Sequence, residues 1–229
     1  LTILGSGTSQ GIPVIACDCP VCRSADPHDK RLRASAMLDI KGKKIIIDAG
    51  PDFRYQMLRS QVKDLRAILL THGHKDHIGG LDDVRAFNWV KQGAVDVYGN
   101  EGTREVVYKD FSYAFAAFRY PGVPEINYHV IDDRPFYIDD IQVVPIPVLH
   151  YKMPVLGFRI GNFAYITDAK TIPASSMERL KGVEYLVINA LRKELHMSHF
   201  NLEEALTMIA RIQPKSAFLT HIGHQMGLS

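Results

Sequence analysis

Runs of alternating or continuous apolar residues divide the chain into short segments that predict both strands and helices. ASAMLDIKG (34–42) alternates apolar and polar residues, and KKIIIDAG (43–50) follows it across a Lys-Gly-Lys turn, which predicts a β-hairpin. Helical spacing directly after a proline predicts a helix over 52–60. The continuous apolar run RAILLT (66–71) predicts a buried strand.

The rest of the chain continues this mixture of elements. Further strands are predicted at 2–5, 95–99, 126–131, 134–138, 141–150, 155–160, 162–167, 183–189 and 216–220. Further helices are predicted at 82–92, over the first half of 101–122, around 174–181 and at 201–212. The order favours two sheets packed face to face with helices outside. We therefore expect an α/β fold, a four-layer αββα sandwich, and a single domain over 1–229.

Glycines follow the first predicted strand in GSGTSQGIP. The spacing of Gly5, Gly7 and Gly11 does not match G-x-G-x-x-G, and no amphipathic helix follows. The glycines therefore indicate a tight turn and not a dinucleotide-binding loop.

Composition and charge narrow the class of protein. The chain has 229 residues, of which 46% are hydrophobic and 23% charged, as in an ordinary globular domain. No apolar run reaches 18 residues, so no membrane span and no membrane partner are expected. The net charge of +2, with basic and acidic residues interspersed, argues against a dedicated nucleic-acid surface but allows a small anionic substrate.

Three cysteines, Cys17, Cys19 and Cys22, lie together in ACDCPVC. An odd number of cysteines within six residues is a poor disulfide framework but a good metal-binding motif. It indicates a reducing compartment such as the cytoplasm. Tetrahedral zinc needs a fourth ligand, for which we favour His224, with His28 as the alternative. The site would hold a structural zinc ion; the competing interpretation is three reduced cysteines without metal.

The stretch THGHKDH directly follows the buried strand at 66–71. His72 and His74 are two residues apart, so in extended backbone both imidazoles point the same way and can converge on one ion. Asp76 and His77 follow where the chain turns, and could face a second ion. A solvated turn that is rich in histidine is the alternative explanation.

Three further candidate ligands each end a predicted strand. They are His150 after IQVVPIPVL, Asp168 after NFAYIT, and His221 after SAFLT. A single histidine at a strand end is usually structural, but three strands that end in metal-binding side chains favour a metal site. Because a carboxylate can bridge two cations, Asp168 is the natural bridging ligand.

This set of residues resembles the metallo-β-lactamase superfamily signature H-x-H-x-D-H along nearly the whole chain. The resemblance extends to IIIDAG, where Asp48 would orient the metal ligands without binding the metal itself. It implies that metal 1 takes His72, His74, His150 and Asp168, and that metal 2 takes Asp76, His77, Asp168 and His221. The signature indicates the fold and a binuclear site, but it does not identify a substrate.

The cysteine loop, the late histidine and GSGTSQGIP together resemble the phosphoribosyl 1,2-cyclic phosphodiesterases of phosphonate metabolism. That branch implies hydrolysis of a small phosphodiester by a hydroxide that bridges two divalent cations, which could be manganese, zinc or iron. In SHFNLEEAL it implies His199 as the general acid. Asp76, in THGHKDH, is a second candidate catalytic residue. His196 is the alternative acid, and a merely structural place beside the helix near Asn201 is the competing interpretation.

Other functions remain as alternatives. One is a transfer-RNA 3′-processing endonuclease, although the chain has no Gly/Pro/Lys-rich insertion of the kind that forms an RNA-binding arm. Another is a non-catalytic carrier that resembles the synthesis protein of pyrroloquinoline quinone, and a third is a thioesterase. The aromatic segment 108–120 is interpreted as core packing, with a lid or a homodimer contact as the alternative.

Overall fold

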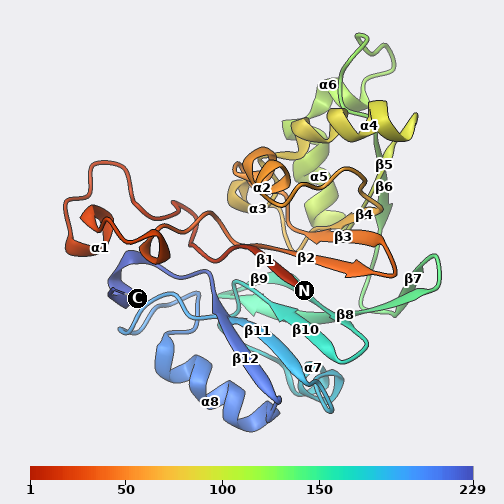
Figure 1. The fold of residues 1–229 in the computed structure, drawn as a ribbon. Coiled ribbons are helices and arrows are strands. Elements are labelled where there is room, and N and C mark those ends of the chain that lie inside the picture. Colours follow the sequence, from red (N-terminus) through yellow and green to blue (C-terminus); the bar gives the residue numbers. More distant parts are fainter. Residues whose placement is uncertain (229) are drawn as a thin grey trace. The chain divides into compact units, whose positions relative to one another are not determined.

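The computed structural model describes residues 1–228, and its chain separates into two compact units that each take two stretches of sequence. Unit 1 comprises Leu1–Gly5 and Ser35–Asp132, whereas unit 2 comprises Ser6–Ala34 and the chain from Asp133 onward. Each unit contains one six-stranded sheet with its own helices (Figure 1). The predicted single domain over 1–229 stays a prediction.

Unit 1 has the strand order β1-β2-β3-β4-β5-β6, antiparallel up to β3 and parallel from β3 to β6. The strands are β1 (Thr2–Gly5), β2 (Ser35–Ile40), β3 (Lys43–Ile47), β4 (Ala67–Leu69), β5 (Val95–Gly99) and β6 (Ile126–Val130). The helices are α2 (Phe53–Arg59), α3 (Lys75–Ile78), α4 (Arg85–Lys91), α5 (Glu101–Asp110) and α6 (Ser112–Phe115), with a 3-10 turn at Leu81–Val84.

The core of unit 1 lies where the helices cover the sheet. Ile46, Ile68 and Val97, one from each of three neighbouring strands, are fully buried with Phe53 of α2 and Val107 of α5. Burying such side chains contributes about 1.5–3 kcal/mol each. This packing fixes the carboxyl ends of the parallel strands, where the histidine-rich stretch begins.

Unit 2 has the strand order β12-β11-β10-β9-β8-β7, parallel from β12 to β10 and antiparallel from β10 to β7. The strands are β7 (Phe136–Ile138), β8 (Ile141–His150), β9 (Met153–Ile160), β10 (Phe163–Ile166), β11 (Tyr185–Asn189) and β12 (Ser216–Thr220). The helices are α1 (Pro20–Arg23), α7 (Ala174–Arg179) and α8 (Leu202–Ile212), with 3-10 turns at Pro27–Asp29 and His224–Met226.

Helix α8 shows how the sequence sets an element boundary in unit 2. The Asn201 side chain accepts a hydrogen bond from the Glu204 N–H (2.9 Å), and the Glu204 carboxylate accepts one from the Asn201 N–H (3.0 Å). This reciprocal pair is a capping box, which fixes the first turn of the helix. Ala205 and Ile209 on its apolar face then pack on Leu186 and Ile188 of β11.

The aromatic segment 108–120 divides into a buried part and an exposed part. Phe111 is buried in the core of unit 1, and Tyr108 stacks on Phe115 at 3.8 Å between ring centroids. Phe118 is 88% exposed and Tyr120 78% exposed. Tyr108 and Tyr113 are also exposed, by 41% and 43%, so the predicted core packing holds for only part of the segment. The alternatives of a lid or a dimer contact stay predictions.

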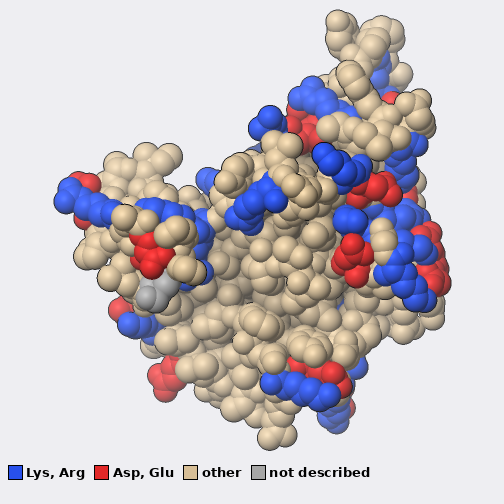
Figure 2. All heavy atoms as spheres, viewed as in Figure 1, with Lys and Arg blue, Asp and Glu red and all other residues tan. Residues whose placement is uncertain are grey.

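Surface charges are mixed on both units. On the face shown in Figure 2, lysine and arginine side chains lie interspersed with aspartate and glutamate. Among residues 1–228, no helix is both long and apolar enough to cross a bilayer. The cytoplasmic location stays a prediction.

Candidate metal centres and active site

Four residues of the stretch THGHKDH gather at the carboxyl end of β4 in unit 1. The chain leaves β4 before His72 and is extended at His74, and Nε2 of His72 lies 3.0 Å from Nδ1 of His74. It then turns into the short helix α3, where Asp76 Oδ2 lies 3.0 Å from His77 Nε2. The rings of His72 and His77 are 4.2 Å apart at their centroids. The predicted grouping of these four side chains is thus present within unit 1.

Asp48 orients this group of side chains through hydrogen bonds. Its buried carboxylate lies 2.6 Å from His77 Nδ1 and accepts hydrogen bonds from the Thr71 N–H (2.8 Å) and the Thr71 hydroxyl (2.9 Å). Burial raises the pKa of Asp48, while the charge and hydrogen bonds of His77 and Thr71 oppose that rise. Because Nδ1 of His77 is engaged by Asp48, its Nε2 is the nitrogen left to bind a metal.

Two glycines allow this arrangement. A Cβ on Gly50 would lie 2.0 Å from the Asp76 carbonyl oxygen, and one on Gly80 would lie 2.1 Å from the Gly50 carbonyl oxygen. The hydrogen bonds Ala49 N to His77 O and Gly80 N to Ala49 O, both 2.8 Å, hold the two segments together. Only glycine fits such an approach, which places the Asp48 loop directly beside α3.

The strand ends of unit 2 bring together a second group of donors. His221 Nε2 lies 3.2 Å from Asp168 Oδ1, and His199 Nε2 lies 2.9 Å from the same oxygen. Donor atoms of His150, Asp168 and His199 all lie within 4.8 Å of one another. The structure therefore brings the three predicted strand-end ligands and the predicted general acid to one place in unit 2.

Backbone and amide groups fix these donors. His150 Nδ1 lies 2.9 Å from the Ser198 carbonyl oxygen, so it must carry the proton and leave Nε2 as the metal-binding nitrogen. Asn189, at the end of β11, uses its side chain to bind both the N–H (2.8 Å) and the carbonyl (3.0 Å) of Ala169, next to Asp168. Neither Asn189 nor Ser198 is among the residues predicted from the sequence. The available signal for Asn189 was a buried amide at the end of an apolar strand.

Three site residues have left-handed backbone conformations. The φ angles are 64° at Asp48, 55° at Asp168 and 54° at His221. Such values are uncommon for residues other than glycine and tend to occur where a structure must aim a side chain precisely.

His199 and His196 differ in their relation to this group. His199 contacts Asp168 directly, whereas His196 lies behind it, with their Nδ1 atoms 3.1 Å apart. Burial, together with the charges of His199 and Arg192, lowers the pKa of His196. Both observations favour His199 over His196 as a proton donor.

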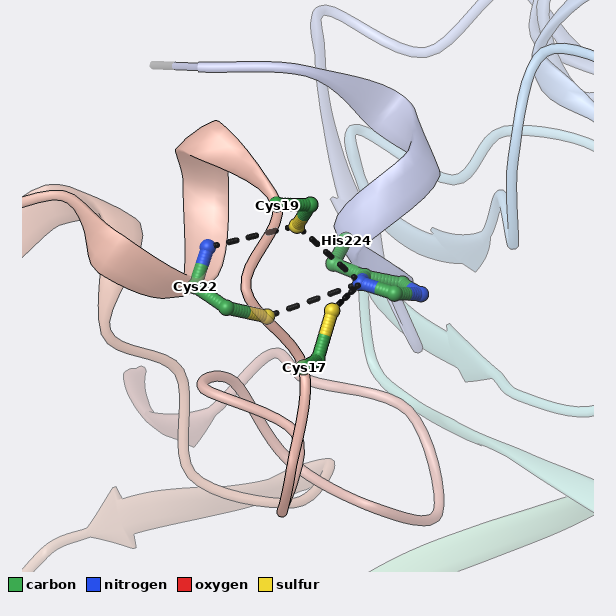
Figure 3. A group of neighbouring side chains, drawn as sticks. All are labelled: Cys17, Cys19, Cys22 and His224. Carbon is green, nitrogen blue, oxygen red and sulfur yellow. Dashed lines mark hydrogen bonds between the residues drawn. The ribbon is translucent and has the colours of Figure 1, made fainter.

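The cysteine loop forms a separate cluster in unit 2 (Figure 3). His224 Nδ1 lies 3.3 Å from Cys17 Sγ, 3.4 Å from Cys19 Sγ and 3.5 Å from Cys22 Sγ. His28 instead pairs with Asp26 at 2.7 Å, so His224 is the fourth member of the cluster, as favoured above.

The donor set and its chemistry fit zinc. All four donor atoms lie within 4.8 Å of one another, the size of a tetrahedral Cys₃His coordination sphere. The Cys22 N–H, 3.4 Å from Cys19 Sγ, lowers the pKa of the Cys19 thiol to about 6, whereas burial raises the pKa of Cys22. Cys19 therefore becomes the thiolate that a metal requires more readily than Cys22 does.

Comparison with known proteins assigns the family. Residues 43–222 match the model of the beta-lactamase superfamily domain. The chain belongs to the beta-lactamase superfamily. The predicted metallo-β-lactamase-like α/β fold is thereby confirmed.

One solved structure indicates the branch of the superfamily to which the chain is similar. The crystal structure of a diphosphatase from the PhnP family is 40% identical, with a TM-score of 0.92, and covers 98% of this chain and 86% of its own. This similarity confirms the predicted branch of the superfamily.

Two curated relatives are longer proteins. A protein of Porphyromonas gingivalis (strain ATCC BAA-308 / W83) named octanoyltransferase is 42% identical over 229 residues, which are 99% of this chain and 46% of that protein. Ribonuclease Z of Nostoc punctiforme (strain ATCC 29133 / PCC 73102) is 29% identical over 160 residues, which are 68% of this chain and 45% of that protein. The chain thus spans about half the length of these two relatives.

Proposed function

We propose that this superfamily member hydrolyses small phosphodiesters, cyclic ribose phosphates included, with two divalent cations. The observation that carries the proposal is the similarity along nearly the whole chain to a PhnP-family diphosphatase. The donor groups described for each unit support it, because they are the nitrogen and oxygen ligands that manganese, zinc and iron accept.

The ligand assignment forms part of the proposal. Metal 1 would be held by His72, His74, His150 and Asp168, and metal 2 by Asp76, His77, Asp168 and His221. The superfamily signature supports this division, and the protonation states that Asp48 and the Ser198 carbonyl impose on His77 and His150 agree with it. When bound, such ions act as Lewis acids that lower the pKa of water and neutralise charge on phosphate oxygens.

Among the chain's own residues, His199 would act on the leaving group. Its Nε2 faces Asp168, and its Nδ1 lies 3.1 Å from Ser198 Oγ. A protonated imidazole held in this way can donate to the leaving oxygen as the P–O bond breaks. The neighbouring hydroxyl limits rotation of the ring, which keeps the donor in place.

The replacement Asp168→Ala tests the binuclear assignment. We expect loss of the active-site metals and of turnover of bis(p-nitrophenyl) phosphate, since a bridging carboxylate would be missing from both ions. Metal analysis and initial rates measure both effects. Asp133→Ala, which removes an exposed carboxylate paired with Arg179, is the control. Full activity in Asp168→Ala would refute the assignment.

A substrate panel distinguishes the alternatives. We expect preferential hydrolysis of cyclic ribose phosphodiesters over linear diesters, because ring opening relieves strain. Faster cleavage of a labelled transfer-RNA precursor would favour the endonuclease, an alternative that the similarity to ribonuclease Z of Nostoc punctiforme supports. One tightly bound zinc ion per chain without turnover would favour the carrier.

A further inference from the structure

Unit 1 contains a cavity that shares no residue with the candidate metal ligands. Its volume is about 240 Å³, and it opens between α2 and α4. It is lined by Phe53, Arg54, Met57, Leu58, Val62, Lys63, Asp83, Ala86, Phe87 and Val90. Since all of these residues belong to one unit, the cavity is defined by that unit alone.

The floor of the cavity is apolar and firmly packed. Phe53, Met57 and Phe87 are all buried, and the rings of Phe53 and Phe87 meet edge to face at 6.2 Å. The apolar surface continues outward over Leu58, 59% exposed, and Val90, 67% exposed. A concave apolar surface with exposed apolar walls gains free energy when an apolar group covers it.

The mouth of the cavity carries an excess of positive charge. Arg54 and Lys63 line it with exposed side chains, and within residues 1–228 neither side chain has a hydrogen-bond or ion-pair partner. Asp83 is the one acidic residue of the lining. By contrast, Lys91, a cation of α4 outside the cavity, pairs with Asp96. The two cations of the mouth are therefore available to an anion.

We propose that this cavity binds a free straight-chain carboxylate of medium length. The chain lies on Phe53, Met57 and Phe87, and the carboxylate is held between Arg54 and Lys63. The volume is below the range of roughly 300–1,000 Å³ that is typical of drug-sized ligands, so it suits a small ligand such as a single short chain. This inference does not depend on the proposed hydrolase activity.

Isothermal titration calorimetry with butanoate, hexanoate, octanoate and decanoate tests the proposal. If the chain is buried, each added methylene tightens binding by up to about fourfold until the cavity is full. Octanol, which has no carboxylate, should bind more weakly than octanoate. Equal affinity for short and long carboxylates, or no binding of any of them, overturns the proposal.

Two pairs of variants locate the binding. Ala86→Phe fills the cavity and should abolish octanoate binding, whereas Ala174→Phe, a matched change at an exposed alanine of α7, should not. Arg54→Ala should weaken octanoate binding several-fold and leave octanol unaffected. Lys109→Ala, at an exposed cation of α5 that does not line the cavity, is its control.

All four changes are at exposed positions, and thermal unfolding shows that each variant is folded. Undiminished octanoate binding by folded Ala86→Phe would show that the ligand lies elsewhere, which contradicts the proposal. If Ala86→Phe does not fold, Arg54→Ala still decides, because equal loss of octanoate and octanol binding would exclude the proposed contact with the carboxylate.

Discussion

Asp48 fixes the orientation of His77, one of the histidines of unit 1. It engages His77 Nδ1 and takes two hydrogen bonds from Thr71, all from a fully buried position. Asp48→Asn keeps the shape but removes the negative charge that favours the proton on Nδ1. Groups in such a supporting position typically account for 10–100-fold in metal affinity.

We therefore expect Asp48→Asn to weaken metal binding at the active site by roughly 10–100-fold. Titration of the metal-free protein with manganese against a competing chelator measures the change. Asp39→Asn, at a half-exposed carboxylate on the neighbouring strand, is the matched control. Unchanged affinity in Asp48→Asn would show that Asp48 is merely structural.

His199 gives a prediction that depends on the leaving group. Loss of a general acid costs typically 10²–10⁴-fold when the leaving oxygen needs a proton. His199→Ala should therefore lose about that much activity on a diester with an alkyl leaving group, and far less on bis(p-nitrophenyl) phosphate. His196→Ala should lose less on the alkyl diester. Equal losses on both substrates in His199→Ala would argue for a role in folding or metal binding.

The sequence predicts some of these residues better than others. Side chains such as His72 and Asp168 could be identified because the spacing of the histidines and the ends of the strands can be predicted from the sequence. The Ser198 carbonyl could not, since every residue has a carbonyl and only the folded chain selects one. The positive φ angles of Asp168 and His221 could not be predicted either, because most aspartate and histidine residues have negative φ angles.

At the scale of elements, periodicity predicted the long strands and helices, including the hairpin of β2 and β3. It missed α1, α3 and α6, because four residues are too few to show a helical period. The strand order could not be predicted either. Which strands become neighbours depends on contacts between distant residues, such as those that pair β10 with β11 in parallel.

One contact between strands makes stability depend on pH. Asp96 of β5 lies 2.6 Å from Arg66 before β4 and 2.9 Å from His129 of β6. Burial would raise the pKa of Asp96, but the hydrogen bonds from His129, Arg66 and Asn127 outweigh it and lower the pKa. A lowered pKa stabilises the fold above the ordinary value of 3.8, and this stabilisation is lost as the pH falls through the folded value.

Asp96→Asn should therefore destabilise the protein at pH 7 by about 1–2 kcal/mol. The difference from the unmodified protein should shrink as the pH falls below about 4. Thermal unfolding across this range measures both effects. Asp64→Asn provides the comparison, since this exposed residue of the same unit shows no ion pair among the described residues. A difference that stays constant with pH would exclude the charge of Asp96 as the cause.

For the molecule as a whole, the Cys₃His cluster makes a prediction that is separate from catalysis. Cys22→Ser should remove one zinc ion per chain and lower the free energy of unfolding by at least about 2 kcal/mol, roughly 4–8 °C in Tm. Metal analysis and thermal unfolding measure these changes. His28→Ala is the control, because His28 lies near the cysteine loop in sequence but pairs with Asp26. Full zinc content in Cys22→Ser would contradict the assignment.

The same cluster joins parts of the chain that are far apart in sequence, with Cys17 and His224 separated by 207 residues. A bound ion would close a loop of that length and so lower the conformational entropy of the unfolded chain.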